Sequence, residues 1–417
     1  MNSSTKRKIF FTNILGCFML LVFNQLDFTR RATKFQVLSS YVTDLRAQNG
    51  TKYILIWTNP DKEPIKLWGP GQEQFIKRKC KVNSCYVTPN RTLLQSVSQF
   101  DAIAFHGPDI KGKYLSVPKV RSMHQKYVFV SMESSHYYPI CDKNFDGFFN
   151  WTWTYRLDSD ESYGYITIRN ITGDIIGPNK IMNWVELDSM KPIDKKTKAM
   201  LDKKNKTAAW FVSNCNSLSK REKYVEKLQN ELKKYGLGVD VFGACRGASH
   251  TCPRTIEHEC FKMVQEEYYF YLSLENSFSE DYVTEKLLTA LQNYAVPVVF
   301  GGANYTRFMP DGIYLHGGEI MPSDLAKEMN DIIKDKDRYY NFFKWRNHYS
   351  YHPREEAPDS DGLCRICEML HDETLVTKET VHKDIRNWWN GPEACSPPAF
   401  HGAVYMIYLA QHSEIIF

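Results

Sequence analysis

The stretch from Tyr268 to Phe300, YYFYLSLENSFSEDYVTEKLLTALQNYAVPVVF, constrains the fold of this 417-residue chain most strongly. Its first seven residues form an apolar run that is typical of a buried strand, and a polar turn follows. We expect a helix to begin near Tyr282, with leucines at helical spacing, and the next strand to cover residues 296–300. A strand-loop-helix-strand unit of this kind predicts an α/β fold.

Lys286 lies in the first turn of that expected helix. The carboxyl end of a strand and the amino end of the following helix form a crevice that favours an anion. A lysine at this position opposes the helix dipole. Two interpretations are open: the lysine shares the crevice with a bound phosphate, or it extends into solvent.

The same alternation of strands and helices fills two halves of the chain. In the first half we expect strands at Tyr53–Trp57, Asp101–Phe105 and Tyr127–Met132. In the second half we expect strands at 207–213, 239–242 and 312–315, and helices at 220–235, 256–267 and 324–334, the last capped by Ser323.

Seven lysines between Lys191 and Lys206 indicate a solvated linker between the halves. The sequence therefore predicts two Rossmann-like domains, 51–190 and 207–350, that face a cleft where ligands meet. A cysteine-containing segment follows over 351–417.

The N-terminus predicts a membrane anchor. Basic residues at 6–8 precede an apolar run over 9–23, which is short for a membrane span of roughly 17–25 residues. No small-residue cleavage site follows, so we interpret the run as an uncleaved signal anchor with residues 1–8 in the cytosol. Residues 24–50 would form a stem, and the short span would suit a Golgi-type bilayer.

Cysteines and glycosylation sequons agree with a luminal location for the rest of the chain. Of 11 cysteines, only Cys17 lies in the apolar run, which leaves an even number for disulfide pairing. Sequons of the form N-x-[ST] follow the anchor at Asn49, Asn90, Asn150, Asn170, Asn205 and Asn304. The net charge of +5 is far below that of a nucleic-acid binder, and we expect no nucleic-acid partner.

Several motifs resemble those of the α1,3-fucosyltransferase family. They are ENSFSEDYVTEK with the following VPVVFGG, FVSNCNS and KREKYVEKL upstream, and VFVSMESSHYYP and TYRLDSD in the first half. The resemblance covers about Tyr53 to Cys367. It implies a GT-B fold, GDP-fucose as donor, and inverting transfer to O3 of an N-acetylglucosamine (GlcNAc) by a Golgi type II membrane protein. The acceptor stays open between an N-acetyllactosamine or LacdiNAc-type antenna and the innermost GlcNAc of an N-glycan.

Inverting transfer requires one carboxylate that deprotonates the acceptor hydroxyl. Glu133 follows an expected strand of the first domain, and the resemblance also points to it as the base. The family usually has an E-S-P motif here, but this chain has Ser135 in place of the proline. Without the resemblance, a strand-end glutamate in a salt bridge would be the simpler interpretation.

The resemblance also assigns the donor side. Arg221 and Lys286 match positions that contact the pyrophosphate, where Arg offers a planar fork and Lys a point charge. Glu285 matches a carboxylate near the fucose and ribose. Asn214, Asn276 and Tyr282 match further donor contacts.

Each of these donor-side residues also has a simpler interpretation. Arg221 could be an exposed helix residue, Glu285 a first-turn glutamate favoured by the helix dipole, and Asn214 a turn former. Glu275 could equally hold the loop as a buried carboxylate or contact substrate.

Metal and zinc sites are less well supported. Three D-x-D strings, Asp158/Asp160, Asp335/Asp337 and Asp359/Asp361, arise easily by chance among 48 acidic residues. We therefore predict no dedicated metal site, although a divalent cation (Mn²⁺ or Mg²⁺) could stimulate transfer. Cys364 and Cys367 have the spacing of half a zinc site. By resemblance they would instead form disulfides with Cys80 and Cys85, in a connectivity that stays open.

Two rival functions remain at this point. One is a non-catalytic, membrane-tethered glycan-binding protein on the same fold, and the other is a metal-dependent D-x-D enzyme of a different fold.

Overall fold

The computed structural model describes residues 50–111, 116–246, 252, 257–391 and 395. The expected cytosolic tail, the signal anchor, the stem up to residue 49, Cys17 and Asn49 lie outside these described residues. None of the helices in the described part is both long and apolar enough to cross a membrane. From Lys52 onward, the described residues form one compact unit.

The first half of the chain forms a parallel six-stranded sheet in the order β2-β1-β3-β4-β5-β6. The three strands expected here are β1, β3 and β4, each shifted by one residue from its predicted bounds. The strands are β1 (Lys52–Ile56), β2 (Cys85–Thr88), β3 (Ala102–His106), β4 (Lys126–Ser131), β5 (Trp151–Thr154) and β6 (Glu161–Ser162).

The second half forms a parallel five-stranded sheet in the order β10-β9-β11-β12-β13. This pair of parallel α/β sheets confirms the predicted fold class. The strands are β9 (Lys206–Phe211), β10 (Val239–Phe242), β11 (Tyr268–Leu274), β12 (Val296–Phe300) and β13 (Leu315–His316).

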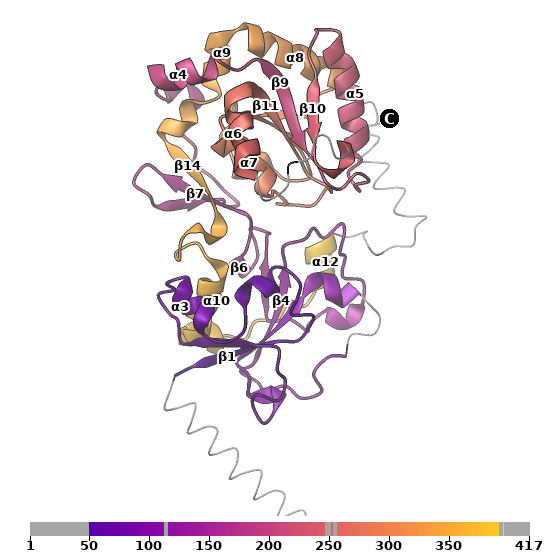
Figure 1. Ribbon diagram of the computed structural model, residues 1–417. Helices are drawn as coiled ribbons and strands as arrows, with labels where there is room; N and C mark the ends of the chain where they lie inside the picture. The colour runs from indigo at the N-terminus through magenta and orange to yellow at the C-terminus, as the bar shows by residue number, and fades with distance from the viewer. Residues whose placement is uncertain (1–49, 112–115, 247–251, 253–256, 392–394, 396–417) are drawn as a thin grey trace, which may run out of the picture. The chain divides into compact units, whose positions relative to one another are not determined.

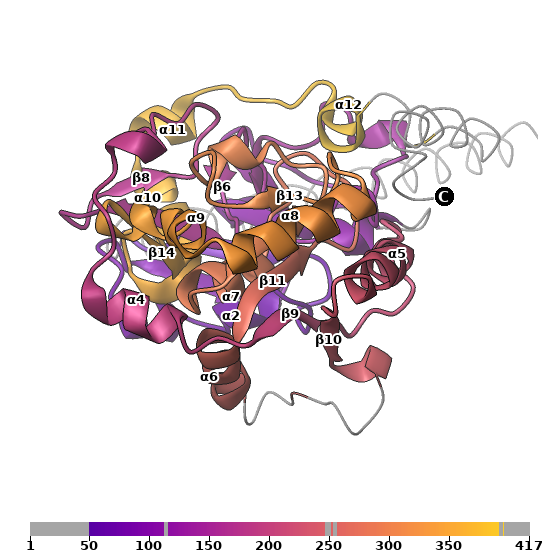
Figure 2. The same ribbon diagram turned by 90° about the horizontal axis from the view of Figure 1, so that it is seen from above.

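Helices cover both faces of the second sheet. On one face, α5 (Arg221–Lys233) and α8 (Pro322–Lys334) pack against Phe270 and Leu272 of β11, and Figure 2 shows α8 lying across this sheet. On the other face, α6 (Glu257–Glu267) packs against Tyr268 and Tyr271. Helix α7 (Glu285–Gln292) also lies on this side, against β11 and β12.

The predicted start of α7 at Tyr282 was wrong, because the helix begins at Glu285. Asp281 has φ of 58°, in the left-handed region, and Thr284 is extended, so neither residue can continue a helix. Two other boundaries also differ. Met321, not Ser323, is the N-cap of α8, with Pro322 at the first helical position. The strand expected at 312–315 is shorter and begins later, as β13 at Leu315. Gly312 cannot belong to it, because its φ of 82° places it in a turn.

The lysine-rich segment is more structured than a solvated linker. Helix α4 (Lys195–Leu201) occupies its middle, and Asp194 caps that helix by accepting from Thr197 N. Lys204 is buried, and its ammonium donates to the carbonyls of Tyr268 (2.7 Å) and Tyr294 (2.5 Å). Lys204 is therefore a tether to the second sheet.

The C-terminal segment returns to the first sheet. Strand β14 (Tyr349–Pro353) pairs antiparallel with β7 (Ile166–Asn170), which also pairs with β8 (Ile175–Gly177). Helix α10 (Gly362–His371) then packs beside β1 and β3, so its orange ribbon lies among the indigo elements in Figure 1. The remaining helices are α2 (Ile65–Trp68), α3 (Glu73–Lys77), α9 (Lys336–Asn341), α11 (Glu373–Thr377) and α12 (Ile385–Asn390).

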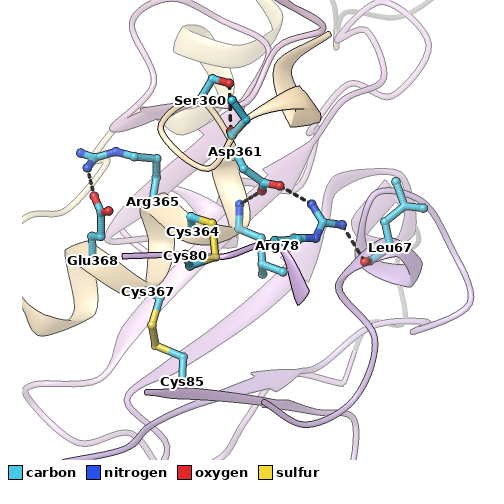
Figure 3. Close-up of a disulfide and its surroundings, with 12 residues drawn as sticks. Leu67, Arg78, Cys80, Cys85, Ser360, Asp361, Cys364, Arg365, Cys367 and Glu368 are labelled. Atoms are coloured by element: carbon cyan, nitrogen blue, oxygen red, sulfur yellow. Dashed lines mark hydrogen bonds and ion pairs between the residues drawn. A yellow bond between two sulfur atoms is a disulfide. The ribbon is translucent and has the colours of Figure 1, made fainter. Parts of the chain in front are cut away.

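Two disulfides attach the C-terminal helix α10 to the first half of the chain. Cys80 bonds to Cys364, and Cys85 bonds to Cys367, which joins α10 to the start of the first sheet (Figure 3). Further bonds link Cys141 with Cys395, Cys215 with Cys245, and Cys252 with Cys260. All ten cysteines after the apolar run are thus paired, as their even number suggested.

Candidate active site

The loops after β4 and β11 are hydrogen-bonded directly to each other. The Oγ atoms of Ser277 and Ser134 are hydrogen-bonded at 2.7 Å, and Ser135 Oγ donates to Ser279 Oγ at 3.2 Å. The carboxyl ends of parallel strands are where α/β proteins bind ligands. These contacts therefore join the two sheets at the edge where we expected the site.

Ser135 has a structural reason to differ from the family pattern. Its backbone N–H donates to the Tyr155 hydroxyl at 3.0 Å. Proline has no N–H and could not make this bond. Glu133 therefore lies near the start of a loop that the Ser135–Tyr155 hydrogen bond anchors to the carboxyl end of β5.

Glu133 faces the second half of the chain. Burial raises the pKa of its carboxyl above the ordinary value of 4.5, while the Lys286 ammonium and a hydrogen bond from Tyr282 act in the opposite direction. Glu285 and Glu275 raise it further by repulsion. A half-buried carboxylate with a raised pKa suits a general base.

Lys286 lies at the centre of the donor side. Its Nζ contacts Thr284 Oγ1 (2.6 Å), Glu285 Oε1 (3.1 Å) and Glu275 Oε2 (3.2 Å), and its side chain is 18% exposed. Although burial lowers its pKa, the two carboxylates raise it, and the net shift is upward. Lys286 is therefore a mostly buried cation held by protein oxygens, and the interpretation of a lysine extending into solvent was wrong.

Glu275 has a clearer role than the sequence indicated. It is 1% exposed, and its Oε1 accepts from Thr284 N and Thr284 Oγ1, both at 2.9 Å. It thereby holds the residue before α7 and also neutralises Lys286. The available signal was its position directly after a fully buried strand, where a charged residue requires a partner.

Arg221 is buried, with 3% of its surface exposed, so the interpretation of an exposed helix residue was wrong. Its Nη1 donates to Leu274 O at 2.5 Å and its Nη2 to Asn214 O at 3.4 Å, which ties the ends of β9 and β11 together. Its Nε is buried without a hydrogen-bond acceptor among the described residues. Its charge repels Lys286 and lowers the pKa of that lysine.

The other predicted donor-side residues line the same loops. Tyr282 is buried, and its ring makes an edge contact with Tyr155 at 4.9 Å between centroids. Asn276 Oδ1 accepts from Ser277 Oγ at 2.9 Å, and Asn214 Nδ2 donates to the Tyr137 hydroxyl at 3.1 Å.

Glu285 differs from its neighbours in exposure. Its side chain is 64% exposed. Partial desolvation by the surrounding loops would raise the pKa of its carboxyl, but the attraction of Lys286 outweighs this and holds the pKa below the ordinary value. An exposed carboxylate beside a buried lysine is the most easily displaced partner of that lysine. Glu285 could therefore release Lys286 to an incoming anion.

Five of the six D-x-D aspartates have protein partners. Asp158 pairs with Arg156 at 2.9 Å, and Asp160 accepts from Thr152 N at 2.8 Å. Asp335 and Asp361 cap α9 and α10, and Asp359 pairs with Arg169. Asp337 lies in the first turn of α9.

One group of potential metal ligands is close enough to hold an ion in the part of the chain that the structure describes. It comprises Cys85, Cys367 and His371. The two sulfur atoms are bonded to each other, so they are not thiolate ligands.

The sequon asparagines differ in their accessibility. Asn90, Asn205 and Asn304 are exposed, and Asn170 is half-buried. Asn150 uses both ends of its amide: Oδ1 accepts from Tyr127 N, and Nδ2 donates to Thr380 O, each at 2.8 Å. A glycan on Asn150 would replace one of the two hydrogens of Nδ2, on a half-buried nitrogen that the Thr380 carbonyl already contacts.

Comparison with known proteins identifies the family. The family model "Fucosyltransferase, N-terminal" matches residues 49–166, and "Glycosyltransferase family 10 (fucosyltransferase) C-term" matches residues 201–388. Alpha-(1,3)-fucosyltransferase C of Drosophila melanogaster is 36% identical over 349 residues, which cover 81% of this chain and 78% of that protein.

Two further similarities extend the comparison. The human 4-galactosyl-N-acetylglucosaminide 3-alpha-L-fucosyltransferase FUT6 is 32% identical over 328 residues, 77% of this chain and 79% of that protein. A crystal structure of an α1,3-fucosyltransferase with GDP-fucose aligns with a TM-score of 0.46 at 14% identity, over 80% of this chain and 93% of that one.

The two family models and the Drosophila relative define this protein as a glycosyltransferase. The chain belongs to glycosyltransferase family 10, the fucosyltransferases.

Proposed function

We propose that this protein is an α1,3-fucosyltransferase that transfers L-fucose from GDP-β-L-fucose to O3 of GlcNAc in glycoprotein glycans, with inversion at the anomeric carbon. The observation that carries the proposal is the contact between the loops after β4 and β11, which places Glu133 within electrostatic range of Lys286. A base from the first half faces a buried cation from the second, as a single-displacement transfer requires.

In the proposed step, Glu133 takes the proton of the acceptor hydroxyl as its oxygen bonds to the fucose anomeric carbon. The bond from that carbon to the diphosphate oxygen breaks on the opposite face, and GDP leaves with the electron pair. Lys286 offsets the charge of the leaving diphosphate. Arg221 Nε, which makes no hydrogen bond to any described residue and lies 3.7 Å from Glu222 Oε1, offers it a further donor.

The proposed donor site requires a local rearrangement. Since Lys286 already contacts three side-chain oxygens, a diphosphate must replace one of them. Glu285 is the exposed partner and is the one expected to turn away, toward the fucose and ribose hydroxyls. Glu275 is buried and stays in place.

We propose a Golgi location, with the catalytic part in the lumen behind a single N-terminal span. The five disulfides support an oxidising compartment. Three exposed sequons, at Asn90, Asn205 and Asn304, support the same side of the membrane.

A two-acceptor assay tests the proposed function. Residues 50–417 would be secreted as a soluble protein and incubated with GDP-fucose and either an N-acetyllactosamine (or LacdiNAc) antenna or an N-glycan bearing its core GlcNAc. We expect fucose on one of these acceptors in α1,3 linkage, identified by NMR. Transfer to neither acceptor, by protein that is folded by circular dichroism, would overturn the proposal.

A further inference from the structure

A group of charged side chains next to the site has no place in the transfer step described above. It contains three cations and three carboxylates, here called the clasp: Arg156, Lys180, Arg307, Asp158, Glu280 and Asp281. Its members come from the loop after β5, from the segment after β8, from the loop after β11 and from the turn after β12.

Asp281 is the buried centre of the clasp. Its side chain is 0% exposed, and its Oδ1 accepts from Arg307 Nη1 at 2.5 Å. Its Oδ2 lies 3.0 Å from Lys180 Nζ and accepts from the backbone N–H of Leu157 at 3.2 Å. A buried carboxylate with two cations and an N–H donor is strongly held, because removing a partner leaves an uncompensated charge.

The neighbouring Glu280 shares the same cations in a different environment. It contacts Lys180 (2.8 Å), Arg156 (3.2 Å) and Arg307 (3.2 Å), but its side chain is 46% exposed. Exposed ion pairs contribute little, typically about 0–1 kcal/mol. Asp281 and Glu280 thus carry the same charge and share two cations, but only Asp281 is buried. Comparing variants of the two residues therefore distinguishes the effect of a buried charge from that of an exposed one.

Asp281 connects directly to the site on both sides. The next residue, Tyr282, packs on Tyr155 and lies close enough to Glu133 to lower the pKa of its carboxyl. Glu285 and Lys286 follow. Leu157, which Asp281 contacts, lies two residues after Tyr155 in the first half. Asp281 also adopts a left-handed φ of 58°, which an aspartate tolerates better than most residues do.

We propose that Asp281, through its ion pair with Arg307, is a positioning residue that sets the placement of Tyr282 and Lys286 opposite Glu133. This inference rests on the proposed transferase function. It adds that the base and the diphosphate clamp are kept in register by a contact between loops that does not touch substrate.

The variant Asp281→Asn tests this, with Glu280→Gln as the matched control. Asn keeps the shape and an acceptor for Leu157 N–H but removes the charge. We expect kcat/KM for fucose transfer to fall at least tenfold in Asp281→Asn and to stay within threefold in Glu280→Gln. Equal effects of the two variants, or less than threefold loss in Asp281→Asn, would overturn the inference.

The pH profile separates positioning from loss of folded protein. When Lys286 moves away, Glu133 loses its attraction, so the acid limb of the kcat/KM profile should move to higher pH in Asp281→Asn. An unchanged acid limb, with activity reduced only in proportion to folded protein, would contradict positioning.

Arg307→Gln provides a second route if Asp281→Asn does not fold. It removes the same ion pair but leaves the contacts of Asp281 with Lys180 and Leu157. We expect the same upward shift of the acid limb, and where both variants fold, the double variant should be no worse than the more damaging single one. Additive losses would overturn the inference. An inactive wild-type protein would instead count against the proposed function.

Discussion

Lys286 and Glu275 form an ion pair of 3.2 Å in which the side chains are only 18% and 2% exposed. Glu275 begins the loop between β11 and α7, and Lys286 lies in the first turn of α7. The ion pair therefore closes this loop. The cation that we assign to the diphosphate is therefore held in place by a carboxylate that water cannot easily reach.

Replacing Glu275 with Gln should destabilise the fold more than it harms nucleotide binding. The change leaves a buried ammonium with only the exposed Glu285 as counter-charge, at a cost of about 3 kcal/mol in unfolding free energy. GDP affinity should be kept or tightened, because Lys286 loses a competing carboxylate. Urea unfolding and calorimetric titration with GDP check both. Glu285→Gln is the control and should change stability by under about 1 kcal/mol.

A GDP affinity that falls more than tenfold in folded Glu275→Gln would contradict this account. It would mean that Glu275 contributes to binding and not only to the placement of Lys286.

The pH profile of transfer should show an acid limb above pH 4.5. The carboxylate of Glu133 is the active form, so activity is complete above its pKa and is lost as the pH falls through it. Because burial raises this pKa above the ordinary 4.5, the loss begins at a higher pH than for an exposed glutamate. Glu285→Gln removes a repelling charge and should move the limb to lower pH, as measured by kcat/KM between pH 4 and 8. A limb that moves upward would contradict the proposed arrangement.

The two bonds between α10 and the first sheet should be largely redundant. They close loops of 284 and 282 residues, so either one alone constrains the unfolded chain almost as much as both. Replacing the Cys80–Cys364 pair or the Cys85–Cys367 pair by serines should cost about 1–2 kcal/mol, and replacing both about 5 kcal/mol. Chemical unfolding of the three variants measures this. Costs of the two pairs that simply add would show that local packing, not chain entropy, dominates.

Asn150 should differ from the other sequons. Because its amide bonds to Tyr127 N and Thr380 O, we expect no glycan there and a loss of about 2 kcal/mol in Asn150→Ala. Asn90→Ala, at an exposed site, should lose less than about 0.5 kcal/mol. Glycopeptide mass spectrometry and thermal unfolding provide the comparison. A fully occupied Asn150 in stable protein would show that these bonds are dispensable.

Local sequence patterns were sufficient for much of the second sheet. Strands β10, β11 and β12 have the predicted bounds. Strands β11 and β12 were predictable because strands buried on both faces of a parallel sheet are continuous apolar runs. The start of α7 was missed because the left-handed turn at Asp281 carries no glycine to mark it. Residues 275–281 were correctly interpreted as a polar turn, but polarity does not reveal that the non-helical conformation continues to Thr284.

Non-local contacts account for most of what the sequence could not reveal. The burial of Arg221 depends on carbonyls at the ends of two strands, and the role of Glu275 depends on a lysine after the turn. The bond from Ser135 N to Tyr155 explains the missing proline only once β4 and β5 are neighbours. The sequence was enough to predict which residues carry charge near the site, but their interaction partners could be identified only from the fold.

Paired measurements of fucose transfer and GDP binding in Glu133→Gln test the central claim most directly. With the glutamate neutral but nearly isosteric, transfer should fall by about 10²–10⁴-fold, the usual contribution of a general base, while GDP affinity stays within threefold. Glu186→Gln, at an exposed surface position, should leave both unchanged. Transfer that stays within tenfold of wild type in Glu133→Gln would contradict the assignment of Glu133 as the base.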